Sequence, residues 1–467
     1  MRLSHRFTAD SALFDDPNLV SAAGLVPVIA LAERAGLGEL SQQRLSVPTD
    51  KGANAGAKVC ALVGGMVAGA DSIDDMALLR HGAMKKLFSA CYAPSTLGSF
   101  LRAFTFGHVR QLDAVASRVL TNLARLTPVV KGLDEYAVVD VDDTIIEVHG
   151  YAKQGAGFGY TRVRGLNALL ATVSTDQAAP VVVAQRLRKG SVGSPRGADR
   201  LVADALATVA RMRSNQASRP VLVRADSAFY GYPTIGAAVR AGAEVSVTVR
   251  LTSSIRAAIA TIDEQAWTPI EYTDAIRDES TGAWISRAEV AEVPFTAFTA
   301  QARSHHVPGR LVVRRIPDLN PKKGEGQDQL FDTWRFHAFF TTTDADLLDT
   351  VAVDKVHRAH AVIENVNADL KSSALAHLPS GKFAANAAWL VLAVLAFNLT
   401  RAAATLTGHQ LARATTATIR RTMVTVPARA ASSARRLRLH LPTNWPWQQA
   451  WKRLFTTVCG PPLPATT

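Results

Sequence analysis

Cysteine is scarce in this chain, with only Cys60, Cys91 and Cys459 among 467 residues. The three lie far apart, show no CxxC spacing and leave at least one without a partner. A disulfide framework and a cysteine-based zinc site are therefore excluded. We expect the three to be small, buried apolar side chains.

Long hydrophobic runs are also missing. The longest, residues 387–397, is bounded by Asn386 and Asn398 and is shorter than the roughly 20 residues that a membrane-spanning helix needs. Near the start, Asp10, Asp15 and Asp16 interrupt the region where a secretory signal would be apolar. We therefore predict no transmembrane segment and a cytoplasmic protein.

Acidic residues are absent after Asp369, although the chain carries 39 of them. A segment of this kind favours a polyanionic partner, because each phosphate that meets Lys or Arg releases condensed counterions. Nucleic acid is the natural candidate, and a solvated basic tail is the alternative. Twelve basic residues follow Asp369 and account for nearly all of the net charge of +13: Lys371, Lys382, Arg401, Arg413, Arg420, Arg421, Arg429, Arg435, Arg436, Arg438, Lys452 and Arg453.

The periodicity of apolar residues changes along the chain. Apolar residues recur at helical spacing over 25–35, 57–67 and 101–126, which predicts a helical N-terminal region. Within it, residues 94–102 are either a helix that faces DNA or an ordinary capped helix. Strand patterns follow at 137–148, 169–174, 180–185, 220–225 and 244–250, with helices at 197–213 and 234–241, which indicates a mixed α/β sheet beginning with a three-stranded meander. The next region, residues 251–345, contains polar stretches and is predicted to be an inserted, mainly β subdomain. It has strand patterns at 310–316 and 334–341 and a loop-like run at 317–329. Helical periodicity returns over 353–396.

Acidic side chains occupy three positions of one predicted strand and the position just after another. In the strand 137–148, a period of two places Asp140, Asp142 and Thr144 on one face and Asp143 on the other. A carboxylate inside a core strand destabilises the fold unless it is paired with a positive charge or binds a cation. Asp226 directly follows the predicted strand 220–225, at the sheet edge where open α/β proteins bind ligands, although a helix cap would explain it equally well.

The predicted helix 355–371 carries two neighbouring stripes. Val356, Ala359, Ile363, Val366 and Leu370 form an apolar stripe, and one residue further on lies a polar stripe of His357, His360, Glu364, Asn367 and Lys371. The side chains of the polar stripe either take part in a functional site or are only exposed to solvent. Two strand carboxylates and one helix carboxylate would suit hard cations such as Mg²⁺, and a pair of such ions can promote in-line phosphoryl displacement.

At these residues the sequence resembles the DDE transposases of bacterial insertion sequences. Asp142-Asp143-Thr144 resembles the D-x-T of the first catalytic strand, and residues 224–229 resemble the strand end with the second aspartate. Residues 357–371 resemble the helix pattern Y-x2-R-x3-E-x6-K, in which Glu364 and Lys371 match while His357 and His360 replace the Tyr and Arg.

The resemblance implies an α/β fold: an RNase H-like mixed-sheet catalytic core with an inserted mainly β subdomain, flanked by α-helical N- and C-terminal regions. The domains would be a helical DNA-binding region (1–130), the first part of the core (131–250), the insertion (251–345), the catalytic helix with the end of the core (346–403) and a basic C-terminal region (404–467).

The resemblance also implies the site. Asp142, Asp226 and Glu364 would be catalytic and would bind two Mg²⁺ or Mn²⁺ ions, with Asp140 a rival for the first position. A tryptophan of the insertion, Trp267, Trp284 or Trp334, would stack on a flipped base. The DNA contacts would come from His357, Arg358, His360, Lys371, Lys153, Tyr160, Arg162 and Arg164.

The function implied is cut-and-paste transposition by a homodimer that synapses two double-stranded DNA ends, without a membrane partner. Two alternatives remain open: an inactive or repurposed DNA-binding protein on the same scaffold, suggested by His357 and His360, and a metal-dependent nuclease without strand transfer.

Overall fold

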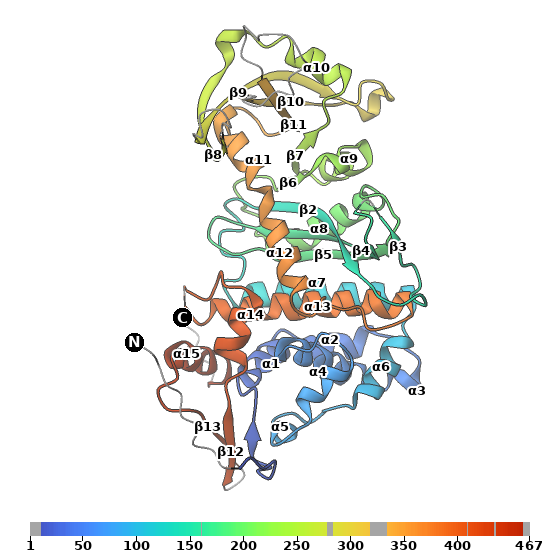
Figure 1. Cartoon of the computed structure of the whole chain (residues 1–467), viewed down its shortest axis with the longest axis vertical. Helices are drawn as coiled ribbons and strands as arrows, with labels where there is room; N and C mark the ends of the chain where they lie inside the picture. Colours follow the sequence, from blue (N-terminus) through green and yellow to red (C-terminus); the bar gives the residue numbers. More distant parts are fainter. Residues whose placement is uncertain are drawn as a thin grey trace.

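The computed structural model describes residues 11–159, 161–277, 284–317, 334–408, 410–433 and 436–460. A mixed sheet of ten strands runs through the upper and middle parts of the molecule, and a layer of helices lies below it (Figure 1). The strand order is β3-β4-β2-β6-β7-β11-β10-β9-β8, with β5 paired to β4. This is the mixed α/β core expected from the sequence.

The half of the sheet that precedes the insertion is built mainly from five strands. They are β2 (Val138–Glu147), β4 (Arg164–Ser174), β5 (Val181–Lys189), β6 (Leu222–Ala225) and β7 (Glu244–Val249), and the two-residue β3 (Gly157–Phe158) also pairs with β4. β2, β4 and β5 form an antiparallel meander, whereas β6 is parallel to β2 and β7 is parallel to β6. Because β6 and β7 run parallel, their carboxyl ends meet at one edge, where ligands bind in such sheets.

The inserted strands do not form a sheet of their own. β8 (Thr268–Arg277), β9 (Trp284–Ala297), β10 (Val307–Pro317) and β11 (Trp334–Thr341) continue the core sheet, because β11 pairs with β7 from Ala338 to Thr341. The short helix α10 (Ser253–Ile259) precedes them. The loop-like run 317–329 lies almost wholly outside the described residues.

Two helices of the core are α8 (Ala198–Met212) and α9 (Tyr232–Arg240). The catalytic candidate Glu364 lies in α12 (Val362–Lys371), which is separated from α11 (Thr350–Arg358) by the 3₁₀ turn η5 (Ala359–Ala361). The prediction of continuous helix over 353–396 is therefore wrong. Residues 372–382, which include Pro379 and Gly381, break the helical pattern before α13 begins.

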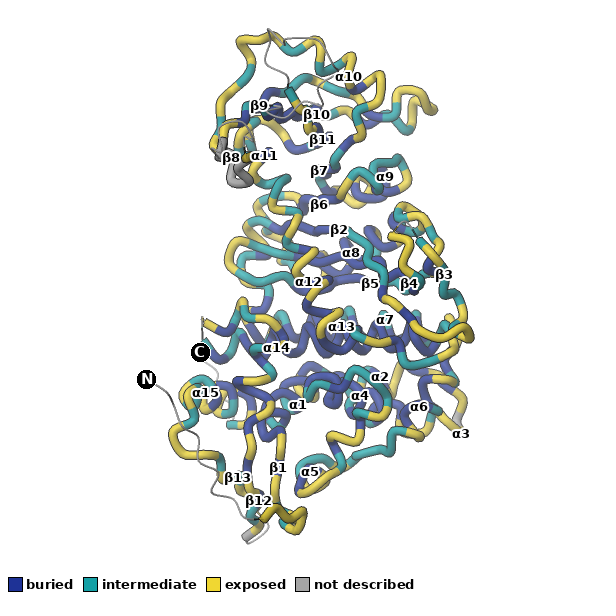
Figure 2. The backbone as a smooth tube through the Cα atoms, viewed as in Figure 1, coloured by how far each residue is buried: buried dark blue, intermediate teal, exposed yellow. Residues whose placement is uncertain are grey.

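The long helix α13 (Phe383–Thr405) joins the sheet to the helices below it. It is apolar on all sides, which is typical of a helix surrounded by protein, and Figure 2 shows it buried along most of its length. Among the described residues it is the one helix long and apolar enough to cross a membrane, but 89% of its most apolar part lies inside the protein. It is a core helix.

Most of the N-terminal helices lie below α13 in Figure 1, whereas α7 runs at the level of α13 and packs against it. The predicted helix 101–126 is in fact split, because α6 ends at Arg102 and Thr105 caps a new helix at Phe106. Of the three cysteines, Cys60 and Cys91 are half-buried, whereas Cys459 is exposed, contrary to our expectation. The helices are α1 (Leu25–Arg34), α2 (Leu37–Arg44), α3 (Thr49–Gly52), α4 (Ala55–Ala68), α5 (Met84–Leu87), α6 (Pro94–Arg102) and α7 (Phe106–Leu126).

The two ends of the chain meet in a second, three-stranded sheet. β1 (Leu19–Val20) pairs with β12 (Ala428–Ser433), which pairs with β13 (Arg436–His440). The short helix α14 (Thr416–Ile419) and a π-helical turn (Arg420–Val424) precede this sheet, and α15 (Gln448–Cys459) follows it. The C-terminal region thus contains strands as well as the expected helices.

Candidate active site

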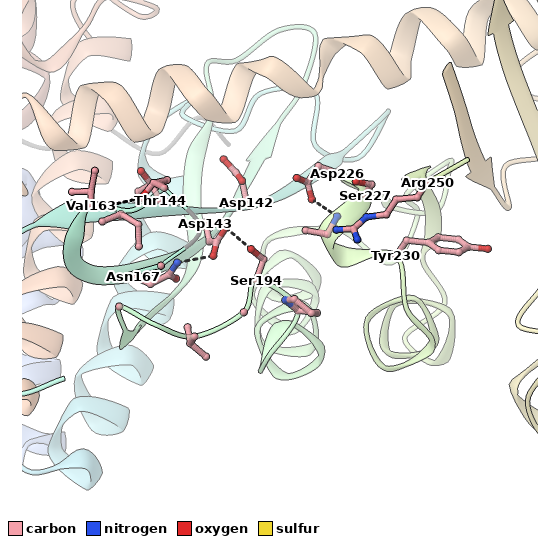
Figure 3. Close-up of a pocket in the computed structure, with 18 of the residues that line it drawn as sticks. Asp142, Asp143, Thr144, Val163, Asn167, Ser194, Asp226, Ser227, Tyr230 and Arg250 are labelled. Carbon is pink, nitrogen blue, oxygen red and sulfur yellow. Dashed lines mark hydrogen bonds between the residues drawn. The ribbon is translucent and has the colours of Figure 1, made fainter. Parts of the chain in front are cut away.

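The acidic side chains of β2 alternate between its two faces, as the period of two predicts. Figure 3 shows Asp142 and Asp143 pointing to opposite sides of the strand. The face with Asp140 and Asp142 is crossed by α12, because Asn367 of α12 donates a hydrogen bond to Asp142. The other face leads toward Ser194, in the loop before α8.

Asp143 is fully engaged within the protein. Its carboxylate accepts hydrogen bonds from Arg188 at 2.5 Å, Asn167 at 2.6 Å and Ser194 at 3.1 Å. These partners come from β5, β4 and the following loop, so Asp143 holds the meander together, although it also lines the cavity shared by Asp142 and Asp226.

Asp140 is also engaged, in a buried network of opposite charges. Its carboxylate, which is completely buried, accepts hydrogen bonds from Nε and Nη2 of Arg224, both at 2.8 Å. Nδ1 of His360 lies 2.8 Å from the same carboxylate. A buried carboxylate is stable only with such compensation, and here the compensation leaves Asp140 no free oxygen that faces a ligand.

Arg224 extends this network to the turn before α12. Its guanidinium also donates to the carbonyl oxygens of Val356 and Ala359, at the junction of α11 and α12. Arg224 thus joins β2 and β6, the two strands with candidate aspartates, to the helix that carries Glu364. We call Asp140, Arg224 and His360 the Asp140 network.

Asp142 and Asp226 open into one cavity of about 1380 Å³. Asp142 accepts a hydrogen bond of 2.9 Å from Asn367, and Asp226 accepts one of 2.9 Å from the backbone N–H of Ala228. Burial raises the pKa of Asp142 to about 6, because desolvation disfavours the carboxylate. A nearby cation would offset this cost, so the geometry favours Asp142 over Asp140 as the ligand-binding residue.

Glu364 lies in the first turn of α12 and is exposed. It is four residues after His360 and three before Asn367, both of which contact β2, so it shares their helix stripe. It is not among the residues that line the cavity. In the described part of the chain, no three His, Cys, Asp or Glu side chains are grouped closely enough to hold a metal ion.

The donors around Asp142 nevertheless fit a hard divalent cation. The Oδ1 atom of Asn367 is buried and has no hydrogen-bond partner, although the amide nitrogen of the same side chain bonds to Asp142. The two aspartates and this amide oxygen are the kind of ligands that Mg²⁺ and Mn²⁺ prefer. The orphaned oxygen would be satisfied by such an ion.

Of the residues predicted to contact DNA, Lys371 and Arg162 are exposed at the cavity. Lys371 is exposed and lines the cavity, and Arg162 is exposed between two cavity-lining residues, Thr161 and Val163. Tyr160 lies outside the described residues. Arg250 also lines the cavity, a position that the sequence analysis missed. It directly follows β7, so the strand-end rule that indicated Asp226 could have found it.

The other predicted contacts have partners inside the protein. His357 lies between Ser246 Oγ at 2.8 Å and Thr248 Oγ1 at 3.0 Å, and its ring stacks on Phe339. His360 belongs to the Asp140 network. Arg358 pairs with Asp354, Lys153 donates to the carbonyl of Leu378, and Arg164 donates to the carbonyl of Gly150.

Two of the three candidate tryptophans flank one arginine of the insertion. The Arg315 guanidinium lies 4.3 Å from the ring centre of Trp267 and 4.4 Å from that of Trp334, and it also pairs with Glu289. Both rings are thus engaged in cation–π contacts. The side chain of Trp284 lies outside the described residues.

Residues 11–459 match the family described as Transposase DDE domain group 1. The match covers nearly the whole chain, so the protein belongs to this family of DDE transposases. No curated protein matches the sequence. Family membership implies DNA binding and phosphoryl transfer, which the family typically carries out with divalent metal ions.

Proposed function

We propose that the protein cuts DNA at the inverted ends of its own element and joins the freed 3′-hydroxyl groups to target DNA. The observation that carries this proposal is the shared cavity of Asp142 and Asp226, which is also lined by Lys371 of α12, the helix that carries Glu364. Carboxylates from two neighbouring strands and one helix are suited to metal-dependent phosphoryl transfer.

In this proposal Asp142, Asp226 and Glu364 hold two Mg²⁺ or Mn²⁺ ions, assisted by Asn367. The bound ions would supply charge neutralisation and an activated oxygen nucleophile. Asn367 fixes the orientation of Asp142 through its hydrogen bond. Lys371, Arg162 and Arg250 surround the cavity with positive charge and would hold the phosphates of the scissile strand.

Two ends must be cut and joined together, so we propose a homodimer bound to two double-stranded DNA ends inside the cell. For the DNA contacts, Lys371, Arg162 and Arg250 are the strongest candidates. His357, His360, Arg358, Lys153 and Arg164 would support the site through their contacts within the protein.

The test is cleavage of a labelled duplex that carries the flanking ends, with and without Mg²⁺. We expect Asp142→Ala, Asp226→Ala and Glu364→Ala each to lower metal-dependent nicking by about 100-fold or more, because each removes charge stabilisation of several kcal/mol. End binding should persist. Asp346→Ala, which removes an exposed carboxylate elsewhere, is the matched control.

The outcomes separate the rival functions. Binding without any nicking by the unmutated protein would identify a DNA-binding protein that has lost catalysis. Nicking without joining would identify a nuclease. Nicking that survives Glu364→Ala would remove this residue from the site.

A further inference from the structure

The hairpin of β12 and β13 is an exposed β-ribbon at the lower end of the molecule, away from the inserted strands (Figure 1). β13 is an edge strand, since its one strand partner in the described structure is β12. The register opposes Arg429 to His440, Ala431 to Arg438, and Ser433 to Arg436.

Side chains of opposite character occupy the two faces of this ribbon. Directly paired residues share a face, so one face carries the small residue Ala431 together with four basic residues. We call this the ribbon face, and its basic members are Arg429, Arg436, Arg438 and His440, all of them exposed.

The opposite face anchors the ribbon to the protein. Val20, Ala428 and Ala430 on that face are each 6% exposed or less, and Leu439 packs against the same core. The part of the ribbon next to β1 is therefore held by a packed layer, whereas Ser432 and Leu437 on the same opposite face are exposed.

Most of the charge of the ribbon face is uncompensated. Arg429 pairs with Asp16 at 3.2 Å. Within the described part of the chain, Arg436 and Arg438 have neither a hydrogen bond nor an ion pair, and no acidic residue follows Asp369. Exposed arginines without internal partners are suited to bind phosphates.

We infer that the ribbon face is a second DNA-binding surface, which docks on duplex DNA away from the bond that is cut. A two-stranded β-ribbon fits the major groove of B-DNA, and the small side chain of Ala431, opposite Arg438, allows close approach. An anionic membrane is less well matched, because membrane-binding surfaces combine basic residues with a broad apolar face. This inference depends on the DNA binding that the family implies and not on cleavage.

The experiment measures binding of the full chain to a duplex carrying the element end, without divalent metal, over a range of salt concentrations. The test variant is Arg436→Ala/Arg438→Ala. Its control, Arg125→Ala/Lys131→Ala, removes the same charge from two exposed residues near the end of α7. Thermal unfolding of both variants establishes that each is folded.

We expect the hairpin variant to bind about tenfold or more weakly, with a salt slope smaller by about 2, because each lost phosphate contact lowers the slope by about 0.9. The control should bind like the unmutated protein. Equal binding by both variants, or equal weakening of both, would overturn the inference. Unchanged DNA binding with lost adsorption to vesicles of anionic lipid would assign the surface to membranes and also overturn it.

Nicking by the hairpin variant at saturating protein keeps this result separate from the proposed function. Normal metal-dependent nicking with weakened binding supports a docking surface outside the active site. If the unmutated protein instead fails to nick DNA while the hairpin variant still binds DNA more weakly than the control, the proposed function is overturned. That result would still support the ribbon face as a DNA-binding surface.

Discussion

For His357, the role expected from the sequence differs from the environment found in the structure. In the sequence it occupies a position of the family motif at which a DNA contact is expected. In the structure, both ring nitrogens lie next to hydroxyl groups and the ring stacks on Phe339. Burial, followed by the positive charges of His360, Arg224 and Arg314, lowers the pKa of His357 well below its ordinary value.

The lowered pKa predicts that His357 makes stability depend on pH. The unfolded chain binds a proton near pH 6.5, whereas the folded protein resists it. The contribution of His357 is therefore complete above about pH 6.5 and is lost as the pH falls below that value, by up to about 1.4 kcal/mol per pH unit. Urea unfolding at several pH values measures this dependence.

His357→Gln should flatten the pH dependence between about pH 5 and 7, since the titrating group is gone. His149→Gln, at an exposed position, serves as the control and should leave it unchanged. Identical pH profiles for all three proteins would show that His357 is not held neutral by the fold.

At the scale of the element, two aspartates of β2 that are only two residues apart have different environments. Asp140 and Asp142 share a face, yet Asp140 is completely buried against Arg224, and Asp142 lines the cavity. The spacing along β2 cannot distinguish them. The difference depends on which part of α11, η5 and α12 lies over each position.

This division predicts opposite effects for two matched substitutions. Asp140→Asn leaves Arg224 buried without a counter-charge and should lower the free energy of unfolding by about 3–5 kcal/mol. Asp142→Asn removes a desolvated carboxylate and should leave stability at pH 7 equal or higher, while abolishing nicking. Urea unfolding and the nicking assay, run at a temperature where both variants are folded, measure both effects.

Each variant is the control of the other, since both make the same chemical change on one face of one strand. A stable Asp140→Asn protein without nicking, beside an active Asp142→Asn protein, would reverse the two assignments. Asp140 would then take the first position of the catalytic set.

At the scale of the whole molecule, α13 connects the catalytic sheet to the helices formed by the N-terminal part of the chain. Asn398, at one end of its apolar run, bonds to β5 of the sheet, whereas Asn386, at the other end, bonds to the loop before α13. Asn398 donates to the backbone carbonyl of Val182 at 2.8 Å and accepts from its N–H at 2.9 Å. Asn386 makes the same pair of bonds with the backbone of Ser380.

Replacing Asn398 tests this connection. Asn398→Leu keeps the approximate volume but leaves two buried backbone groups of β5 unpaired, each at a cost of about 1–3 kcal/mol. We expect the free energy of unfolding to fall by about 2–4 kcal/mol in urea titrations. Asn365→Leu, at an exposed position of α12, is the control, and equal stability of the two variants would contradict the role of Asn398.

The sequence by itself determined the features that depend on local order. Periods of two and of 3.6 residues located the core strands and most helices, because side-chain direction repeats with the backbone. The motifs around Asp142, Asp226 and Glu364 were sufficient to indicate the family, which the match over residues 11–459 confirms. The start of α7 at Phe106 was missed, because the apolar stripe over 101–126 looks continuous in the sequence although Thr105 caps a new helix.

Only the tertiary structure decided which of these side chains are available for chemistry. Arg224 reaches Asp140 across 84 positions of the sequence, and Ser246 reaches His357 across 111. Pairing of β11 with β7 likewise makes the insertion part of the core sheet. Burial and charge compensation come from segments that folding brings together, and desolvation of a carboxylate or imidazole depends on those neighbours rather than on its own place in the chain.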